Sequence, residues 1–337
     1  METKILSSEE ANLKLAKHIL KRGGLVAFPT ETVYGLGASA KSGRALKRIF
    51  AAKGRPQDNP LIVHLSDTSK IKKYVKSINP IEQRIIDAFM PGPISIVLQK
   101  NWRISKVATA GLNTVAIRVP SNLETYRFLK VANLPIAAPS ANTSKRPSPT
   151  NAQDVLEDMN GKIPLIIDGG NTVVGVESTV VKVIDGVIHI LRPGRIGAKE
   201  LKEATGCEVV LKNQITAEEK PESPGVKYEH YAPKCEMALI VGRQNGIVDK
   251  ALSLYDELKV RGKNPVILCA KRNASFYNGK EHLIIGKTSN EVCNSIFATL
   301  RRCEKKYDYI ICEYVGGGTM EDAMLDRLTK SCRGNII

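Results

Sequence analysis

Residues 28–37 of the chain read Phe-Pro-Thr-Glu-Thr-Val-Tyr-Gly-Leu-Gly. They follow a short apolar run at 25–28, whose composition predicts a buried strand. Pro29 ends that strand, and polar side chains follow it at the carboxyl end, where ligands bind in open α/β sheets. Gly35 and Gly37 allow tight turns and a close approach of the backbone. The segment therefore predicts either a ligand-binding turn or an ordinary strand-to-helix turn.

Length and composition limit the class of protein. The chain has 337 residues, more than one core usually serves, so we expect two domains. A hydrophobic content of 42% and a charged content of 25% are typical of soluble globular proteins. No apolar run approaches the roughly 20 residues that cross a bilayer. The first ten residues are acidic and lack an apolar signal core, which favours a cytoplasmic location.

The net charge of +16 is unevenly distributed. Residues 1–206 hold 30 Lys and Arg against 17 Asp and Glu, whereas residues 207–337 hold 20 against 17. A positive field over the N-terminal part suits the phosphates of a nucleotide or of RNA. Taken alone, the charge favours a basic surface that only keeps the protein in solution.

All seven cysteines lie after residue 206, and no two have the C-x-x-C spacing. The odd number and the spacing argue against a zinc site and against a disulfide framework. Cys269 and Cys312 lie within apolar strand patterns and are expected to be small buried hydrophobes. The basic N-terminal part has no thiol, which excludes cysteine nucleophile chemistry there.

The second half of the chain changes character at about residue 207. Acidic residues and prolines indicate a linker at 207–235, although an inert linker would not normally carry Tyr228, His230 and Tyr231 beside a Pro-Gly turn. Short apolar strand patterns then alternate with helical ones. The strands are expected at 237–241, 266–270, 282–285 and 309–312, and the helices near 246–260, 289–304 and 320–331. This alternation predicts a small α/β domain with a parallel sheet.

Five polar, turn-rich segments each follow or open an apolar strand, so their strand ends can meet at one cleft. The segments are 29–37, 53–64, 139–150, 175–179 and 192–195. They and the strand 114–120 supply cations for anion binding (Lys53, Arg55, Arg118, Arg192 and Arg195) and uncharged hydrogen-bonding groups (Thr32, Ser140, Asn142, Ser148 and Ser178). The chain has neither a Ser-His-Asp set nor a carboxylate pair. The residue types indicate a site that positions phosphates and a carboxylate, as phosphoryl and nucleotidyl transfer require.

Each of these residues also has an ordinary structural explanation. Arg118 could lie on an exposed strand face, and His64 could be a core histidine with satisfied hydrogen bonds. Lys53 and Arg55 could interact with a helix dipole. Other residues could serve as turn formers or solvated charges, namely Ser140, Asn142, Asp168 and Glu177. The site is favoured only because so many such residues follow successive strands.

The ordered motifs resemble the Sua5/YrdC family. The motifs are those at 28–37, Lys-Gly-Arg-Pro (53–56) with Asn-Pro-Leu-Ile-Val-His (59–64), Pro-Gly-Pro (91–93), Ala-Ile-Arg-Val-Pro (116–120), Ala-Pro-Ser-Ala-Asn (138–142), Gly-Val-Glu-Ser-Thr (175–179) and Leu-Arg-Pro-Gly (191–194). The linker, Ser-Pro-Gly-Val-Lys-Tyr-Glu-His-Tyr-Ala-Pro (223–233), resembles the connector of the long, two-domain Sua5 form. In the C-terminal domain, the main similarity is Asp-Arg-Leu (326–328).

The resemblance implies an α/β architecture in three parts. A YrdC-like catalytic domain at 1–206 would form a twisted mixed sheet with helices around a basic cleft. A linker or lid would follow at 207–235, and a smaller Rossmann-like domain with a parallel sheet would occupy 236–337. The linker tyrosines and histidine would cover the cleft and limit hydrolysis of a labile product.

The resemblance also implies an activity. Family members make L-threonylcarbamoyl-AMP and pyrophosphate from L-threonine, bicarbonate and ATP accompanied by Mg²⁺, which is the first step of the t6A modification at position 37 of tRNA. The matching threonine-site residues are Thr32, His64, Arg118, Ala138 and Ser178. The matching ATP-site residues are Lys53, Arg55, Asn59, Thr114, Ser140, Asn142, Ser148, Arg192 and His230. Lys53, Arg55 and Arg118 would be the catalytic cations, no protein-held metal is expected, and a t6A transferase complex would take the product.

Two departures from the family pattern and two other functions complete the expectations. Ser144-Lys145 stands where the family often has Ser-Gly, and Ser95 stands where threonine is common.

A non-catalytic RNA-binding module could use the same basic cleft, although the site offers few aromatic side chains for base stacking. Carbamoyl transfer in hydrogenase maturation is a further alternative, against which the chain lacks cysteine-rich zinc motifs and an acylphosphatase-like region.

Overall fold

The computed structural model describes residues 2–211, 230–242 and 244–337. It divides into two compact units. Unit 1 comprises Met1–Ser144 and Ser148–Tyr228, and unit 2 comprises Lys145–Pro147 and Glu229–Ile337. Both are α/β, which confirms the expected fold class. Residues 145–147 therefore lie within the first part of the sequence but pack with the second.

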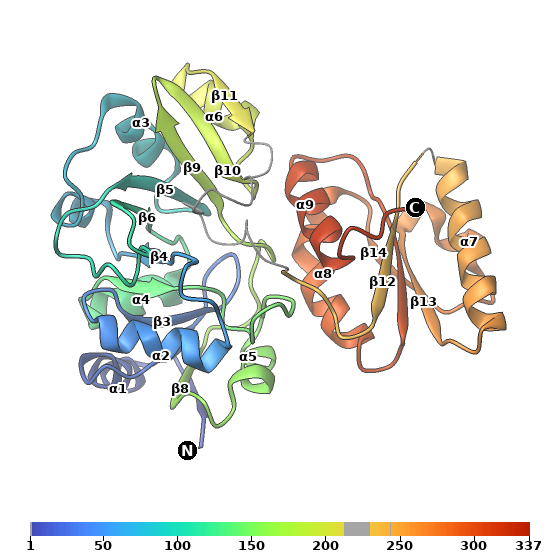
Figure 1. Ribbon diagram of the computed structural model, residues 1–337, viewed down its shortest axis with the longest axis horizontal. Helices are drawn as coiled ribbons and strands as arrows, with labels where there is room; N and C mark the ends of the chain where they lie inside the picture. The colour runs from blue at the N-terminus through green and yellow to red at the C-terminus, as the bar shows by residue number, and fades with distance from the viewer. Residues whose placement is uncertain (1, 212–229, 243) are drawn as a thin grey trace. The chain divides into compact units, whose positions relative to one another are not determined.

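Unit 1 is built on an eleven-stranded mixed sheet with the strand order β1-β8-β2-β3-β7-β4-β6-β5-β9-β10-β11 (Figure 1). Its central strands β4 and β6 run parallel, and β7 and β5 flank them in antiparallel pairing. The strands are β1 (Lys4–Ser7), β2 (Val26–Phe28), β3 (Gly35–Ser39), β4 (Ile62–His64), β5 (Ile94–Gln99), β6 (Thr114–Arg118), β7 (Ile136–Ala138), β8 (Leu165–Asp168), β9 (Thr179–Ile184), β10 (Val187–Arg192) and β11 (Val209–Leu211). The last of these falls inside the range expected to be linker.

The helices of unit 1 begin at side-chain caps where the sequence provides them. Ser42 accepts a hydrogen bond from Ala45 N at the start of α2, and Gly54 ends that helix at a φ of 62°. Asn79 and Glu82 form a capping box at the start of α3. The helices are α1 (Glu10–Lys21), α2 (Gly43–Lys53), η1 (Thr68–Lys73), α3 (Pro80–Phe89), α4 (Leu123–Ala132), α5 (Ala152–Met159) and α6 (Ala198–Thr205).

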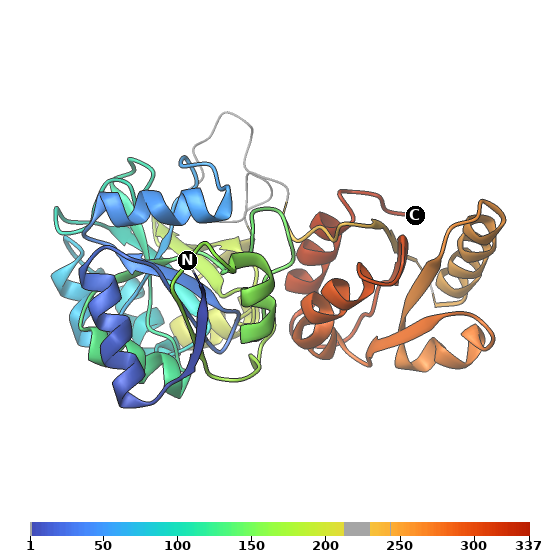
Figure 2. The same ribbon diagram turned by 90° about the horizontal axis from the view of Figure 1, so that it is seen from below.

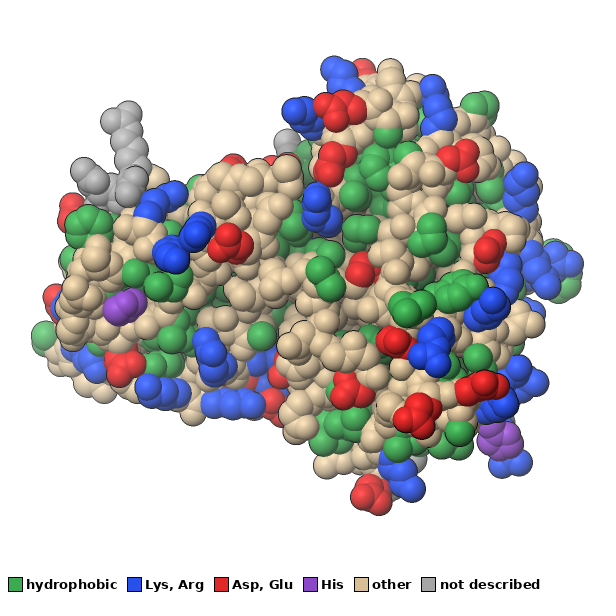
Figure 3. All heavy atoms as spheres, turned by 180° about the vertical axis from the view of Figure 1, so that it is seen from behind, with side chains coloured by type: hydrophobic (Ala, Val, Ile, Leu, Met, Phe, Trp, Pro, Cys, Tyr) green, Lys and Arg blue, Asp and Glu red, His purple; other side chains and the backbone are tan. Residues whose placement is uncertain are grey.

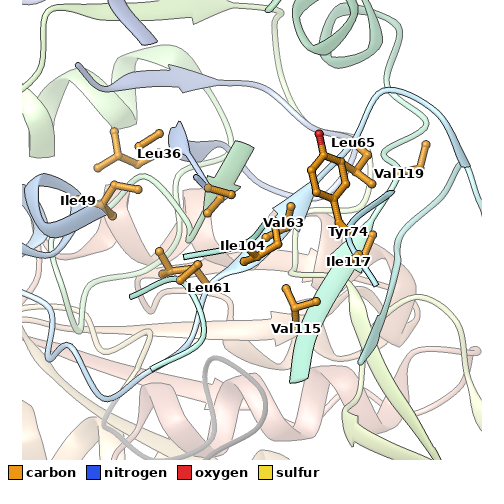
Figure 4. Packing of buried hydrophobic residues seen from close by; sticks show 14 of the residues in the cluster. Leu36, Ile49, Leu61, Val63, Leu65, Tyr74, Ile104, Val115, Ile117 and Val119 are labelled. Carbon is orange, nitrogen blue, oxygen red and sulfur yellow. The ribbon is translucent and has the colours of Figure 1, made fainter. Parts of the chain in front are cut away.

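The two faces of the sheet are covered differently. On one face, Val63, Val115 and Ile117 belong to the large core that α2, α3 and α6 close (Figure 4). On the other face, α1 and α4 cover β2, β7 and β8, and Figure 2 shows α1 and α2 on opposite sides of the sheet. Because side chains alternate along a strand, Thr114, Ala116 and Arg118 lie on this second face. We call it the α1/α4 face.

The glycines of the opening segment serve close packing: of the tight turns and the close backbone approach expected of Gly35 and Gly37, the close approach is what the structure shows. Gly35–Ser39 form the buried strand β3, which pairs with β2 and β7. A Cβ atom at Gly37 would lie 2.7 Å from Ile136 Cγ2 and 2.8 Å from Phe28 Cε1. Only glycine leaves room for those two side chains. The glycine signal is therefore a packing requirement between neighbouring strands.

Unit 2 contains a four-stranded parallel sheet in the order β12-β15-β13-β14 (Figure 1). Its elements are β12 (Glu236–Ile240), α7 (Gln244–Val260), β13 (Pro265–Ala270), η2 (Lys271–Tyr277), β14 (His282–Gly286), α8 (Ser289–Cys303), β15 (Tyr309–Glu313) and α9 (Glu321–Ser331). The parallel sheet and its alternating helices confirm the expected C-terminal architecture. Cys269 and Cys312 are fully buried in it, as predicted.

The surface carries charges of both signs. On the face shown in Figure 3, Lys and Arg side chains lie at many points, with Asp, Glu and hydrophobic side chains among them. Among the described residues, no helix has both the length and the apolar character that crossing a membrane requires.

Candidate functional site

The part of the α1/α4 face formed by β4, β5, β6, β9 and β10 has an apolar floor. The floor consists of Ile62, Val97, Ala116, Val180 and Leu191, which form a cluster separate from the larger cores. Polar predicted site residues flank these side chains along the strands. His64 follows Ile62 on the same face, and Thr114 and Arg118 lie on either side of Ala116. A ligand lying on this face would meet an apolar centre and polar ends.

Arg118 organises one end of the site. It is the last residue of β6, it is only 3% exposed, and its Nη1 donates to Thr32 Oγ1 over 2.9 Å. Its Nη2 lies 2.9 Å from Glu31 Oε2, which forms an ion pair with both side chains nearly buried. The other oxygen of Glu31 accepts from Ser121 N at 3.2 Å. The guanidinium is thus fixed by a hydroxyl and a carboxylate from the segment 28–37.

His64 lies beside Arg118 because β4 and β6 pair in parallel with these two residues in register. Burial is the main cause that lowers the pKa of His64, and the charge of Arg118 lowers it further, to about 3. The ring packs edge-on against Phe28, with centroids 5.8 Å apart. The imidazole is therefore neutral at physiological pH and can accept a hydrogen bond at one nitrogen and donate one at the other.

Ser178 belongs to the same end of the site. It immediately precedes β9, whose first residue Thr179 pairs with Ile94 of β5. Its hydroxyl lies 2.8 Å from Ser95 Oγ and receives a 3.1 Å hydrogen bond from Arg192 Nη2. Arg192 also donates to the carbonyl of Ser178, from Nε at 3.1 Å and Nη2 at 2.9 Å. Arg192 therefore fixes both the backbone and the side chain of Ser178.

The opposite end of the site lies where β4 and β6 begin. Thr114 opens β6, four residues before Arg118, so the two lie about 13 Å apart at about 3.3 Å per residue. Because β4 is parallel to β6, the loop before β4, with Arg55 and Asn59, lies at the Thr114 end. Arg55 Nη2 donates to Pro60 O at 3.4 Å, and Asn59 is 1% exposed. Ala138 pairs with Ile62, between the two ends.

Lys53 holds the segment that follows Ala138. It is the last residue of α2, and its buried ammonium group donates to Ser140 O at 2.6 Å and to Asn142 O at 2.5 Å. Ser140 Oγ donates to Asn142 Oδ1 at 2.5 Å. A charged donor to two carbonyls fixes this backbone firmly. Lys53 thus acts on the loop directly, in addition to any contact with a ligand.

The loop 139–150 is attached to the segment 28–37 as well. Tyr34 N donates to Pro149 O at 2.9 Å, and Tyr34 O accepts from Ala141 N at 2.8 Å. Ser148 is fully buried, and its hydroxyl donates to Glu177 Oε1 at 2.5 Å. The loop that carries the predicted residues Ser140, Asn142 and Ser148 is therefore held against the segment 28–37.

Three of the predicted site residues carry buried polar atoms without a hydrogen-bond partner among the described residues. These atoms are Arg118 Nε, His64 Nδ1 and Asn59 Oδ1. Buried polar atoms are nearly always satisfied in folded proteins, so each exception needs an explanation. Two lie at the Arg118 end and one at the Thr114 end, as expected of atoms that a bound ligand would satisfy.

Comparisons with known proteins agree with this geometry. Residues 18–194 match the Sua5, YciO and YrdC family model, described as "Telomere recombination", and residues 196–332 match the model described as "Threonylcarbamoyl-AMP synthase, C-terminal domain". The chain belongs to the Sua5 family. It is 38% identical to the threonylcarbamoyl-AMP synthase of Pyrococcus abyssi, over 98% of this chain and 96% of that protein.

Two further Sua5 relatives support the assignment over the whole length. The threonylcarbamoyl-AMP synthase of Bacillus subtilis is 38% identical, over 98% of this chain and 96% of that protein. The crystal structure of P. abyssi Sua5 complexed with L-threonine superposes with a TM-score of 0.93 at 37% identity, covering 99% of both chains. The resemblance to the long, two-domain Sua5 form is thereby confirmed.

Sequence reasoning missed roles for Glu31, Tyr34 and Glu177 in this Sua5 chain. Glu31 pairs with Arg118, and Glu177 accepts from Ser148, although a basic site gives no reason to expect buried carboxylates. The hydroxyl of Tyr34 donates to Gly170 O at 2.7 Å, and burial raises its pKa. The one available signal was position, because each residue lies inside a motif that also carries a predicted ligand.

His230 belongs to unit 2, unlike the other predicted ATP-site residues of this Sua5 chain. Its ring centroid lies 5.5 Å from that of Tyr231, which stacks on Phe297 at 5.0 Å. Tyr228 and most of the expected lid lie outside the described residues.

A protein-held Mg²⁺ does not fit the described part of this Sua5 chain. No group of three or more His, Cys, Asp or Glu side chains there could hold a metal ion. Magnesium in enzymes of phosphate chemistry often relies on substrate phosphates and water for most of its ligands.

Proposed function

We propose that the chain joins L-threonine, bicarbonate and ATP to form L-threonylcarbamoyl-AMP, pyrophosphate and water. The observation that carries this proposal is the set of buried, unpaired polar atoms at Arg118, His64 and Asn59, on one face of the sheet. Whole-length similarity to threonylcarbamoyl-AMP synthases supports the same activity. The separation of the two ends suits an amino acid at one and a nucleotide at the other.

Threonine is proposed to bind at the Arg118 end. Its carboxylate would accept from the guanidinium, which the ion pair with Glu31 keeps in one orientation. Thr32, His64 and Ser178 would contact the rest of the amino acid. A neutral imidazole suits this position because a second fixed cation beside Arg118 would be costly to bury. Ala138, between the two ends, is small enough to let the ligand pass over the strands.

The chemistry needs no covalent enzyme intermediate. The threonine amine attacks the carbon of CO₂ or bicarbonate, so a C–N bond forms and a carbamate results. With CO₂ only an amine proton is lost; with bicarbonate a C–O bond also breaks, and the hydroxide leaves with that proton as water. A carbamate oxygen then attacks the α-phosphorus of ATP, and the bond from this phosphorus to the bridging oxygen of the β-phosphate breaks. Pyrophosphate leaves with the electron pair of that bond. Charge on the phosphates increases during this step, and fixed cations would stabilise it.

ATP is proposed to bind from the Thr114 end towards the centre. Arg55 and Lys53 would offer the positive charge for its phosphates, accompanied by Mg²⁺. Arg192, which is bonded to Ser178 at the Arg118 end, would contact the part of the nucleotide that reaches this end. Asn59 Oδ1, a buried acceptor, would take a donor from the nucleoside. Thr114 and Asn142 would donate neutral hydrogen bonds, whereas the hydroxyl oxygens of Ser140 and Ser148, which already donate to Asn142 and Glu177, would accept them. His230 would complete the site from the linker.

The fate of the product is part of the proposal. L-threonylcarbamoyl-AMP is a mixed anhydride, so it reacts readily with water and needs a consumer that transfers the threonylcarbamoyl group to adenosine 37 of tRNA. A t6A transferase complex would do this in the cytoplasm.

The test is pyrophosphate release measured with each substrate omitted in turn. We expect release to require threonine and bicarbonate together, with the adenylate appearing in equal amount. ATP turnover that is indifferent to threonine would refute the proposal. The alternative of a non-catalytic RNA-binding module is not favoured, because the relatives that match over the whole chain are named as synthases.

A further inference from the structure

The loop between Asn142 and Ser148 is divided between the two units. Lys145–Pro147 pack with unit 2, whereas the residues on either side belong to unit 1. Both flanks are fixed, since Ser144 N donates to Lys53 O at 2.8 Å and Ser148 Oγ donates to Glu177 at 2.5 Å. Three residues between two fixed points leave little slack, because each step spans at most about 3.8 Å. The conformation of 145–147 therefore bears directly on Ser148.

Unit 2 holds each of these three residues by a separate interaction. Lys145 O accepts from Ala232 N at 2.9 Å. Arg146 forms an ion pair with Glu304, whose side chain is 1% exposed. Pro147 O accepts two hydrogen bonds from the guanidinium of Arg301, from Nε at 3.1 Å and from Nη2 at 2.6 Å.

Arg301 is the strongest of these anchors. It lies near the end of α8, and it is 1% exposed. Burying a guanidinium is costly unless its N–H groups are satisfied, so two of them on one carbonyl represent a specific arrangement. Arg302, the next residue of the same helix, is exposed. Arg301 is therefore buried because of the contacts at its own position, and not because it lies near the end of a helix.

The bond to Pro147 O controls the backbone of Ser148. The carbonyl of Pro147 and the N–H of Ser148 belong to one planar peptide group, so fixing the oxygen fixes the orientation of the N–H. Arg146 precedes one proline and Ser148 precedes another, Pro149, which restricts both to extended conformations. The segment is therefore stiff enough to transmit the position of Pro147 to the Ser148 side chain.

We propose that Arg301 is a positioning residue for the nucleotide half of the site, acting through Pro147 on Ser148. The inference rests on the proposed function, and it gives the C-terminal domain a role in that function. It does not require Arg301 to touch ATP. Loss of the anchor would allow the Pro147–Ser148 peptide to rotate and would turn the Ser148 N–H, a preorganised backbone donor, away from the nucleotide, while Arg118 keeps its contacts with Thr32 and Glu31.

The test compares Arg301→Ala and Arg301→Lys with Arg302→Ala as a matched control. Threonine-dependent pyrophosphate release gives KM for each substrate. We expect Arg301→Ala to raise KM for ATP about tenfold, the effect of losing hydrogen bonds to a charged group, while KM for threonine changes less than about twofold. Arg301→Lys should restore part of the loss, because one charged donor remains, and Arg302→Ala should match the wild type.

Other outcomes would overturn the proposal. An unchanged KM for ATP, or an equal rise in both KM values, would mean that Arg301 only stabilises unit 2. If Arg301→Ala does not fold, Arg146→Gln weakens a second anchor without opening the core, and it should raise KM for ATP alone; no change would count against the proposal.

Hydrogen exchange separates this inference from the proposed function. Amides at 143–150 should exchange faster in Arg301→Ala, or in Arg146→Gln, while amides of α8 and β15 keep their wild-type rates. This measurement needs no activity, so it still decides the anchoring if the wild-type chain shows no threonine-dependent turnover. Unchanged exchange at 143–150 in a folded variant would refute the anchor even in an active enzyme.

Discussion

Arg118 and His64 lie opposite each other in the parallel pairing of β6 and β4, and the charge of the first helps to keep the second neutral. The arginine is already paired with Glu31, yet its Nε has no partner among the described residues. One fixed cation, one neutral ring and one buried donor therefore meet at this end of the site. Such a combination favours a small ligand with a single carboxylate over a polyanion.

Arg118→Ala should strongly reduce threonine-dependent turnover. The guanidinium can contribute about 2–3 kcal/mol to binding a carboxylate, so we expect kcat/KM for threonine to fall about 30- to 150-fold. ATP binding should remain measurable, because Thr114 and its neighbours lie about 13 Å away along β6. Pyrophosphate release and equilibrium binding of ATP measure the two effects.

A control variant separates the site from general effects of charge. Arg127→Ala removes an exposed arginine that pairs with Glu124 on α4, and it should leave both measurements unchanged. Wild-type dependence on threonine in a folded Arg118→Ala variant would remove Arg118 from the site.

His64 should make the stability of the protein depend on pH in a defined window. Its pKa is lowered to about 3 in the folded chain, against about 6.5 when exposed. Below about pH 6.5 the unfolded chain binds a proton that the folded chain does not bind. The free energy of unfolding is therefore independent of the protonation of His64 above about pH 6.5. It falls by about 1.4 kcal/mol per pH unit between pH 6.5 and pH 3.

Chemical denaturation at pH 7 and pH 5 tests this dependence. The wild type should lose about 2 kcal/mol more stability between these values than His64→Gln, which has no imidazole to titrate. His18→Gln changes an exposed histidine and should retain the wild-type dependence on pH. Equal losses in the wild type and His64→Gln would mean that the ring is accessible to protons in the folded state.

The sequence was sufficient for most of the strands, although not for β1, β3 and β11, and it was insufficient for what depends on tertiary packing. Arg118 within an alternating strand pattern could have faced either side of the sheet, and the pairing of β4 with β6 resolves this. Gly35 and Gly37 were compatible with tight turns and with a close approach of the backbone, and only the packing shows that they make room for Phe28 and Ile136. Glu31 and Glu177 were overlooked because their partners are distant in sequence.

Lys53 should behave as a support of the loop as well as a cation. Lys53→Met keeps the length of the side chain but removes the donor to Ser140 O and Asn142 O, two buried carbonyls. We expect a loss of about 2 kcal/mol in the free energy of unfolding and a rise of about tenfold in KM for ATP. KM for threonine should change much less.

Lys47→Met is the matched control, since Lys47 is exposed on the same helix. It should leave stability and both KM values near the wild type. A Lys53→Met variant with wild-type stability and a large loss of kcat would show that the ammonium group acts on the phosphates alone.

Lys145→Gly should stabilise the protein. Lys145 has a φ of 77°, a left-handed conformation that costs a residue with a Cβ atom about 1–2 kcal/mol. Glycine adopts it without that cost, although it adds about 0.5–1 kcal/mol of entropy to the unfolded chain. The difference predicts a net gain of about 0.5–1 kcal/mol. Residue 145 therefore has a backbone conformation that glycine suits.

Thermal and denaturant unfolding of Lys145→Gly would measure that gain. The control is Lys199→Gly, whose exposed position in α6 has ordinary helical backbone, so the same substitution should destabilise by about 1 kcal/mol. Opposite signs in the two variants would show that the backbone conformation decides the effect. A loss of stability in Lys145→Gly would instead mean that contacts of the lysine side chain outweigh the strain at its backbone.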